Sequence, residues 1–191
     1  NAKYQEPLTT TAVVNDKDAV PKAEEKDEEY IPGRIPRNCS VVGNALEVIY
    51  NSASHAHAQK SFVLTLGGDH SIGASTVLSA LTHRPQTGII WVDAHADINT
   101  PETSVTGNLH GMPIALAMNL CNRTSLPGMS WLKGKPILDP KQIVYIGLRD
   151  LDAGERKFIR GLGIKAFTMH EVDKYGIGEV MRQTFKHLTL P

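Results

Sequence analysis

The sequence predicts an α/β fold of three layers, in which helices cover both faces of a mainly parallel β-sheet. The first observation is that short runs, apolar throughout, alternate with segments of helical periodicity. The second is that clusters of polar residues follow several of these runs directly, as ligand-binding residues do at the carboxyl ends of parallel strands. The length of 191 residues suffices for one domain with a sizeable core.

The elements follow in order from residue 38, and each rests on its own pattern. Strands are predicted at the short apolar runs 62–66, 88–93, 143–148 and 164–168. Helices are predicted where apolar residues recur at helical spacing, at 38–58, 71–83, 109–120, 154–162 and 178–188. His55 and His57 lie two positions apart on the first helix and face different sides, which favours surface histidines over ligands.

Residues 1–37 differ from the rest of the chain. Residues 16–29 contain seven acidic and three basic residues, and prolines interrupt this part of the chain. Such a composition is typical of a solvated surface segment, with an acidic patch for a partner as the alternative. We therefore expect an acidic surface segment over 1–37 and the α/β domain over 38–191.

The composition excludes several classes of protein. Lys plus Arg and Asp plus Glu both number 20, so no overall field favours nucleic acid or an anionic membrane. No apolar run approaches the length of a membrane span, and no secretory signal opens the chain. Two cysteines favour reduced thiols and a cytoplasmic protein, with one disulfide as the alternative. The chain begins at Asn1 without an initiator Met, so a missing N-terminus and a mitochondrial location stay open.

Asp93, His95 and Asp97 are candidate metal ligands directly after the strand predicted at 88–93. In extended backbone, residues i, i+2 and i+4 point to the same side, so these side chains are expected to converge. Mixed carboxylate and imidazole ligation suits a divalent first-row metal. The alternative is a cap for the following helix, which needs fewer such residues.

His70 is a further candidate ligand, because it follows paired glycines at the end of the preceding predicted strand. Alone this signal is weak, since Asp69, His70 and Ser71 also fit a helix N-terminus. The loop over 97–111 is rich in neutral hydrogen-bonding side chains, which recognise a carboxylate or simply form turns. His110 lacks metal-type spacing and is a candidate acid or base.

Four segments together resemble the arginases, a ureohydrolase family: 67–71, 93–99, 106–111 and 144–155. The likeness runs from about residue 38 to the end of the chain. The stretch 106–111 is more similar to arginases than to relatives that act on agmatine or formiminoglutamate. The resemblance implies an arginase/deacetylase-like fold, two Mn²⁺ ions per subunit, a homotrimer, and hydrolysis of L-arginine to L-ornithine and urea by a metal-bridging hydroxide.

The resemblance also implies a role for each site residue. Its metal ligands would be His70, Asp93, His95 and Asp97, with Asp93 bridging both ions. Its catalytic residues would be Asp97, which passes a proton to the departing amine, and His110, which relays protons to solvent. The groups that hold the substrate's α-carboxylate would be Asn99, Ser104 and Thr106, with Asn108 nearby. The α-amino group would meet Asp152 directly and Glu155 through solvent, although a helix cap is a strong alternative for this pair.

The sequence lacks one motif of that family, Ser-Phe-Asp-x-Asp-x-x-Asp-Pro, which supplies two more metal-binding aspartates. The resemblance therefore implies the central portion of an arginase domain, without the family's first strand and with exposed apolar faces. One alternative is a non-catalytic truncated isoform or fragment that acts as a metal- or subunit-binding module. Another is an agmatinase-type ureohydrolase.

Overall fold

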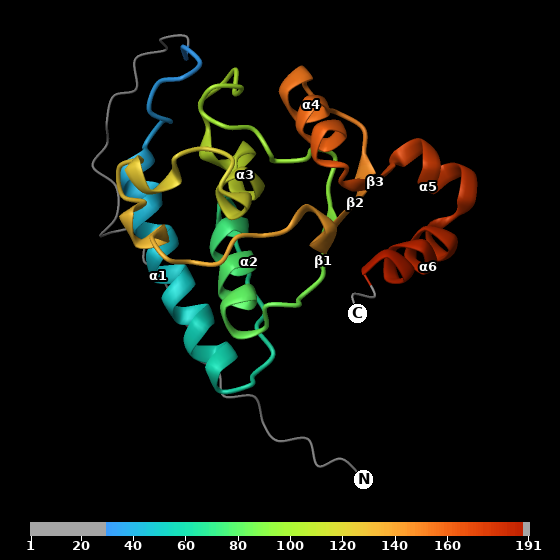
Figure 1. Cartoon of the computed structure of the whole chain (residues 1–191), viewed down its shortest axis with the longest axis horizontal. Coiled ribbons are helices and arrows are strands. Elements are labelled where there is room, and N and C mark those ends of the chain that lie inside the picture. The colour runs from blue at the N-terminus through green and yellow to red at the C-terminus, as the bar shows by residue number, and fades with distance from the viewer. Residues whose placement is uncertain (1–29, 189–191) are drawn as a thin grey trace.

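The computed structural model describes residues 30–188 and contains a three-stranded parallel sheet in the order β1-β2-β3 (Figure 1). Its strands are β1 (Ile89–Val92), β2 (Ile143–Leu148) and β3 (Lys165–Thr168). Three of the four predicted strands and their parallel pairing are thereby confirmed. The acidic stretch 16–29 lies outside the described residues.

Six α-helices accompany the sheet within residues 30–188: α1 (Cys39–Ala58), α2 (Ile72–His83), α3 (Pro113–Met118), α4 (Ala153–Leu162), α5 (Met169–Tyr175) and α6 (Ile177–Leu188). The helix predicted over 109–120 is divided into a 3₁₀ turn at Leu109–Gly111 and α3. Pro113 begins α3, where its missing N–H costs nothing. Helix α5 was not predicted, although Thr168 and Glu171 form a capping box that the sequence could have revealed.

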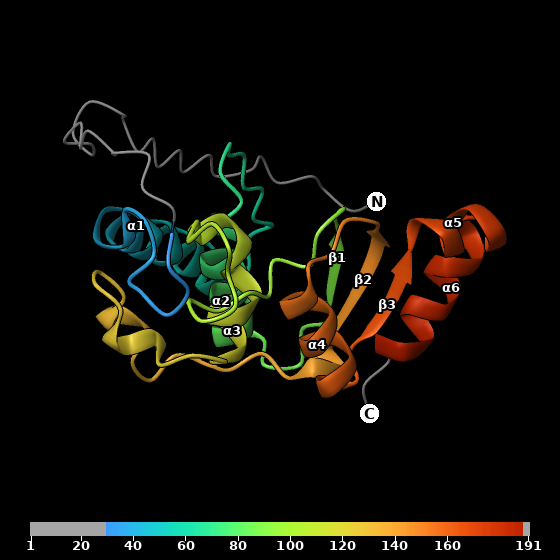
Figure 2. The ribbon, with the colours of Figure 1, turned by 90° about the horizontal axis from the view of Figure 1, so that it is seen from above.

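The central strand β2 divides the core between the two faces of the sheet. Ile143 and Tyr145 pack in the larger apolar cluster with α1, α2 and α3, against which α4 also packs. Val144 and Ile146 pack in a smaller cluster with Val180 of α6. Figure 2 shows α5 and α6 on one side of the sheet and the other helices on the opposite side. The predicted three-layer arrangement is therefore confirmed.

The strand predicted over 62–66 is wrong. This segment has no regular structure, and Phe62 and Leu64 are 92% and 71% exposed. A β-strand needs the backbone of a neighbour, and no described residue pairs with this run. Strand β1 is an edge strand of the described sheet, and Val92 in it is 73% exposed rather than buried as predicted.

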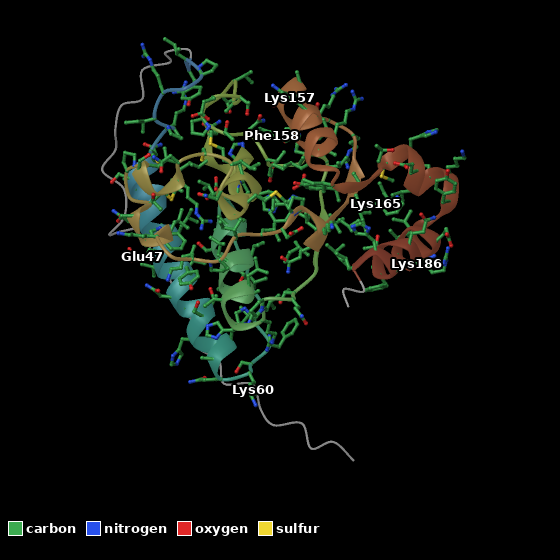
Figure 3. All side chains as sticks on the ribbon, viewed as in Figure 1. Glu47, Lys60, Lys157, Phe158, Lys165 and Lys186 are labelled. Atoms are coloured by element: carbon green, nitrogen blue, oxygen red, sulfur yellow. The ribbon has the colours of Figure 1, made fainter. Side chains whose placement is uncertain are left out.

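The outer surfaces of the helices carry charged side chains. Glu47 on α1, Lys157 on α4 and Lys186 on α6 are exposed and lie at the periphery of the molecule (Figure 3). Among residues 30–188, no helix combines the length and the apolar character that a membrane span requires.

Both cysteines are free thiols, and their pH response can be tested. Burial, and to a smaller extent the neighbouring Cys121, raises the pKa of the Cys39 thiol to about 11. Burial, and to a smaller extent Glu102, raises the pKa of the Cys121 thiol to about 11. A raised thiol pKa favours the folded state below pH ~9, and this contribution is lost as the pH rises through the folded pKa. We expect alkylation at pH 8 to be about 100-fold slower or more in the folded protein than in the denatured chain. Equal rates, measured by mass spectrometry, would show that the thiols are accessible and unperturbed.

Candidate functional site

His70, Asp93 and Asp97 form a cluster of three potential metal ligands near the carboxyl end of β1. The Nδ1 atom of His70 lies 3.1 Å from the Oδ2 atom of Asp93 and 2.6 Å from the Oδ2 atom of Asp97. One ligand atom from each residue lies within 4.8 Å of the other two. One nitrogen and two oxygens at this spacing can surround a single divalent cation.

Two secondary-structure elements bring these ligands together. Asp93 directly follows β1, and its N–H donates to the carbonyl of Ile146 in β2, 3.1 Å away. His70 precedes α2 and stacks on Trp91 of β1, with 4.6 Å between the ring centroids. The end of the strand and the start of the helix thus hold Asp93 and the His70 ring beside each other.

The expectation that 93–97 is extended is wrong. The segment bends after β1, and Asp97 has a φ angle of 51°, in the left-handed region. The Asp97 N–H donates to Glu155 over 2.8 Å, and its carbonyl accepts from Ile114 over 3.0 Å. Asp97 therefore meets His70 because the loop folds back, and not because side chains alternate along a strand.

His95 lies on the other side of Asp93 from His70. Its Nδ1 atom is 3.5 Å from the Oδ1 atom of Asp93, and its Nε2 atom is 3.3 Å from the Oδ2 atom of Asp150. The two oxygens of Asp93 thus face two different imidazoles. Asp150 is an exposed carboxylate beside the second of these imidazoles.

The electrostatics of the cluster favour a bound cation. Burial and then repulsion by Asp93 raise the pKa of Asp97 to about 6, although His70 opposes the shift. The charge of Asp93 therefore disfavours the charged form of Asp97. A divalent cation would replace this repulsion with attraction, so the residues fit such an ion.

The loop after Asp97 is attached to the start of α4. The amide of Asn99 donates to Asp152 over 2.6 Å, and its Oδ1 atom accepts from Thr103 over 2.7 Å. Gly154 permits this contact, because a Cβ atom there would lie 2.7 Å from the Asn99 side chain. Asp152 also caps α4 through a capping box with Glu155, as the alternative interpretation predicted.

The other predicted substrate-binding residues differ in exposure. Ser104 is buried, and its hydroxyl accepts the N–H groups of Thr106 and Gly107 within the loop. Thr106 is exposed and Asn108 is half-buried. Of these three side chains, those of Thr106 and Asn108 are therefore open to a ligand.

Residues 30–37 support this loop, which sequence reasoning missed. The ring of Tyr30 lies against Gly107, where a Cβ atom would clash with it. The Tyr30 hydroxyl donates to the carbonyl of Pro101, and Arg37 donates to the carbonyl of Thr106. A tyrosine in a polar, Pro-containing segment gave no signal of a partner about 70 residues away in sequence.

His110 stands apart from the metal cluster, at the rim of a shallow cleft of about 220 Å³. Its Nδ1 atom lies 3.9 Å from the Oδ2 atom of Asp69, and both side chains are more than half exposed. Asn108 lines the same cleft. The structure therefore places His110 between solvent and the polar loop, without joining it to the three clustered ligands.

Comparisons with known proteins show the family of this chain. A family model described as the arginase family matches residues 5–190. The chain belongs to the arginase family. It is 46% identical over 160 residues to an arginase of Saccharomyces cerevisiae, and the aligned region covers 82% of this chain and 47% of that protein. It is 42% identical over 159 residues to human arginase-1, covering 82% of this chain and 49% of that protein.

Solved arginases share the fold. A native arginase structure from Bacillus caldovelox superposes with a TM-score of 0.75 at 41% identity, covering 86% of this chain and 54% of that chain. The chain spans about half the length of the curated relatives it matches. The arginase fold, incomplete in this chain, is thus the architecture that carries the site.

The side chain of Glu155 makes buried contacts that the arginase resemblance did not imply. Its side chain is 4% exposed, and its Oε1 atom accepts the N–H groups of Ala96 and Asp97 over 3.1 and 2.8 Å. Its Oε2 atom accepts the N–H of Asp152 over 3.2 Å. Burial raises the pKa of Glu155, while these backbone bonds oppose the shift. Both oxygens are therefore engaged inside the protein.

Proposed function

We propose that this chain carries the manganese-binding and substrate-recognition part of an arginase, which hydrolyses L-arginine to L-ornithine and urea. The observation that carries the proposal is the convergence of His70, Asp93 and Asp97 beside a polar loop. The family membership and the arginase names of the relatives support it.

Two manganese ions fit the donors that the structure brings together. His70, Asp93 and Asp97 would hold one ion, and Asp93 and His95 would hold the second. Imidazole nitrogen and carboxylate oxygen are suitable ligands for this metal. When bound, such a pair of cations supplies Lewis acidity and lowers the pKa of a water molecule. The protein's own part is to fix the spacing of the four side chains.

The polar loop would recognise the amino-acid end of the substrate. Thr106 and Asn108 are the open hydrogen-bonding side chains, and they suit a carboxylate without adding charge near the cations. Asn99 and Ser104 are bonded within the loop and to α4, so they would support its shape and contribute through it. Asp152 would pair with the α-ammonium group, since it is half-buried at the edge of this loop.

The substrate's other end determines the chemistry required. A guanidinium group is planar and remains protonated at neutral pH, so its carbon is a poor electrophile. Asp97, beside His70 at the cluster, would hold and transfer the proton that the departing amine needs. His110, exposed at the rim of its cleft, would exchange protons with solvent.

The decisive experiment measures urea release by the purified 191-residue chain with Mn²⁺ and L-arginine. We expect activity that depends on Mn²⁺ and is lost in Asp97→Ala and His95→Ala. Faster turnover of agmatine than of arginine would favour an agmatinase-type enzyme. Tight Mn²⁺ binding without urea release would overturn the catalytic proposal and support a metal- or subunit-binding module.

The proposal includes a trimeric assembly in the cytoplasm. Exposed apolar side chains such as Phe62 and Leu66 support burial against another surface. Two free thiols support a reducing compartment. Sedimentation equilibrium tests the assembly, and a monomer across a wide concentration range would contradict it.

A further inference from the structure

We infer that Glu155 and Tyr145 are positioning residues that hold Asp97 in the conformation a metal ligand needs, an inference that rests on the proposed function. Neither is among the clustered ligands. Both act on the peptide group that joins Ala96 to Asp97, and the two side chains lie almost entirely inside the protein.

This peptide group is held at both of its polar ends. The hydroxyl of Tyr145, in β2, donates to the carbonyl of Ala96 over 2.7 Å in a buried hydrogen bond. The Asp97 N–H at the other end of the group donates to Glu155 over 2.8 Å. The Ala96 N–H donates to the same Glu155 oxygen over 3.1 Å. Rotation of this peptide would therefore break buried hydrogen bonds on two sides.

The conformation held in this way is one that Asp97 would not adopt by preference. A non-glycine residue in the left-handed region is strained, and Asp97 has a φ angle of 51°. Its carboxylate is buried and points at His70, 2.6 Å away. If the peptide were released, the loop would relax and the Oδ2 atom of Asp97 would move away from the other ligands.

Helix capping alone does not account for the hydrogen bonds that Glu155 accepts. Helix α5 has the same capping box, in which Glu171 accepts the backbone N–H of Thr168 and contacts its hydroxyl. In α4 the equivalent bond uses the Oε2 atom of Glu155. The Oε1 atom is directed instead to two N–H groups located 58 and 59 residues earlier in the chain. This second set of bonds connects the cap of α4 to the metal loop.

The test uses two variants and two matched controls in the full chain. Glu155→Gln keeps the shape, but its amide cannot accept from both the metal loop and the Asp152 N–H. Tyr145→Phe removes only the bond to the Ala96 carbonyl. Glu171→Gln alters the equivalent cap on α5, and Tyr50→Phe removes a tyrosine hydroxyl bonded to Thr82, away from the cluster.

Mn²⁺ affinity is measured from the electron paramagnetic resonance signal of the free ion. We expect about 10–100-fold weaker binding in Glu155→Gln and Tyr145→Phe, as for other groups that orient metal ligands. The controls should bind within about twofold of the wild type, because their residues do not contact the loop. Amide hydrogen exchange of the metal-free chain should be faster at Asp97 in both test variants and unchanged in both controls.

The outcomes separate this inference from the proposed function. Wild-type Mn²⁺ binding without urea release would refute the arginase activity, while weaker binding by the test variants would still support the positioning roles. Binding by Glu155→Gln and Tyr145→Phe as tight as by their controls would overturn the inference, as would a wild-type chain that binds no Mn²⁺. If Glu155→Gln fails to fold, Tyr145→Phe decides the question.

Discussion

Asp93→Ala is expected to weaken Mn²⁺ binding by more than about 100-fold, a larger loss than that caused by removing a group that only orients a ligand. Asp93 places one oxygen 3.1 Å from His70 and the other 3.5 Å from His95. Its removal would therefore take a ligand from both proposed cation positions at once. Isothermal titration of the metal-free chain with Mn²⁺ measures the effect.

The control for this experiment is Asp173→Ala. Asp173 is an exposed aspartate on α5, so its removal takes away one carboxylate without touching the cluster. Its Mn²⁺ affinity should equal that of the wild type. If Asp93→Ala bound Mn²⁺ as tightly as this control, the cluster around His70 would not be the manganese site.

Arg123→Met is expected to lower the free energy of unfolding by about 3 kcal/mol, because buried carbonyls lose their donor. Arg123 is 3% exposed, and its guanidinium donates to the carbonyls of Leu116, Ala117, Lys135 and Pro136. Two of these groups belong to α3, near whose C-terminus a cation is also favoured by the helix dipole. Burial lowers the pKa of Arg123, although its guanidinium stays protonated at neutral pH.

Denaturation by guanidinium chloride, followed by circular dichroism, measures this loss of unfolding free energy. Arg156→Met is the matched control, since exposed Arg156 donates to a single carbonyl among the described residues, that of Leu151. We expect the control to change the unfolding free energy by less than about 1 kcal/mol. A similar small change in Arg123→Met would show that water replaces the guanidinium at these carbonyls.

The sequence predicted most of the elements because each rests on a local pattern. The apolar run 143–148 became the buried central strand, and the helical spacing over 38–58 became α1. The prediction was wrong where a pattern depends on a neighbour: Phe62 and Leu64 have strand character but no described partner to pair with. Apolar periodicity reports what a segment can form, whereas a strand also requires a second backbone.

The candidate site was predictable in its residue types and less so in its contacts. The sequence indicated His70, Asp93 and Asp97 as ligands, and these are the residues that the fold brings together. The reason it gave, an extended 93–97 segment, was wrong. The internal engagement of Glu155 was also missed, because a capping box explains only one of its two oxygens.

The sequence by itself determined which residue types follow β1, because these are neighbours in the chain. The alternation of strands and helices along the chain also indicated that the strands run parallel. Only the tertiary structure decided the left-handed turn at Asp97 and the position of His95 on the far side of Asp93. The turn is held by hydrogen bonds from Tyr145 to Ala96 and from Asp97 to Glu155, which span 49 and 58 residues. Such contacts form only once the sheet and α4 are packed, so no local pattern encodes them.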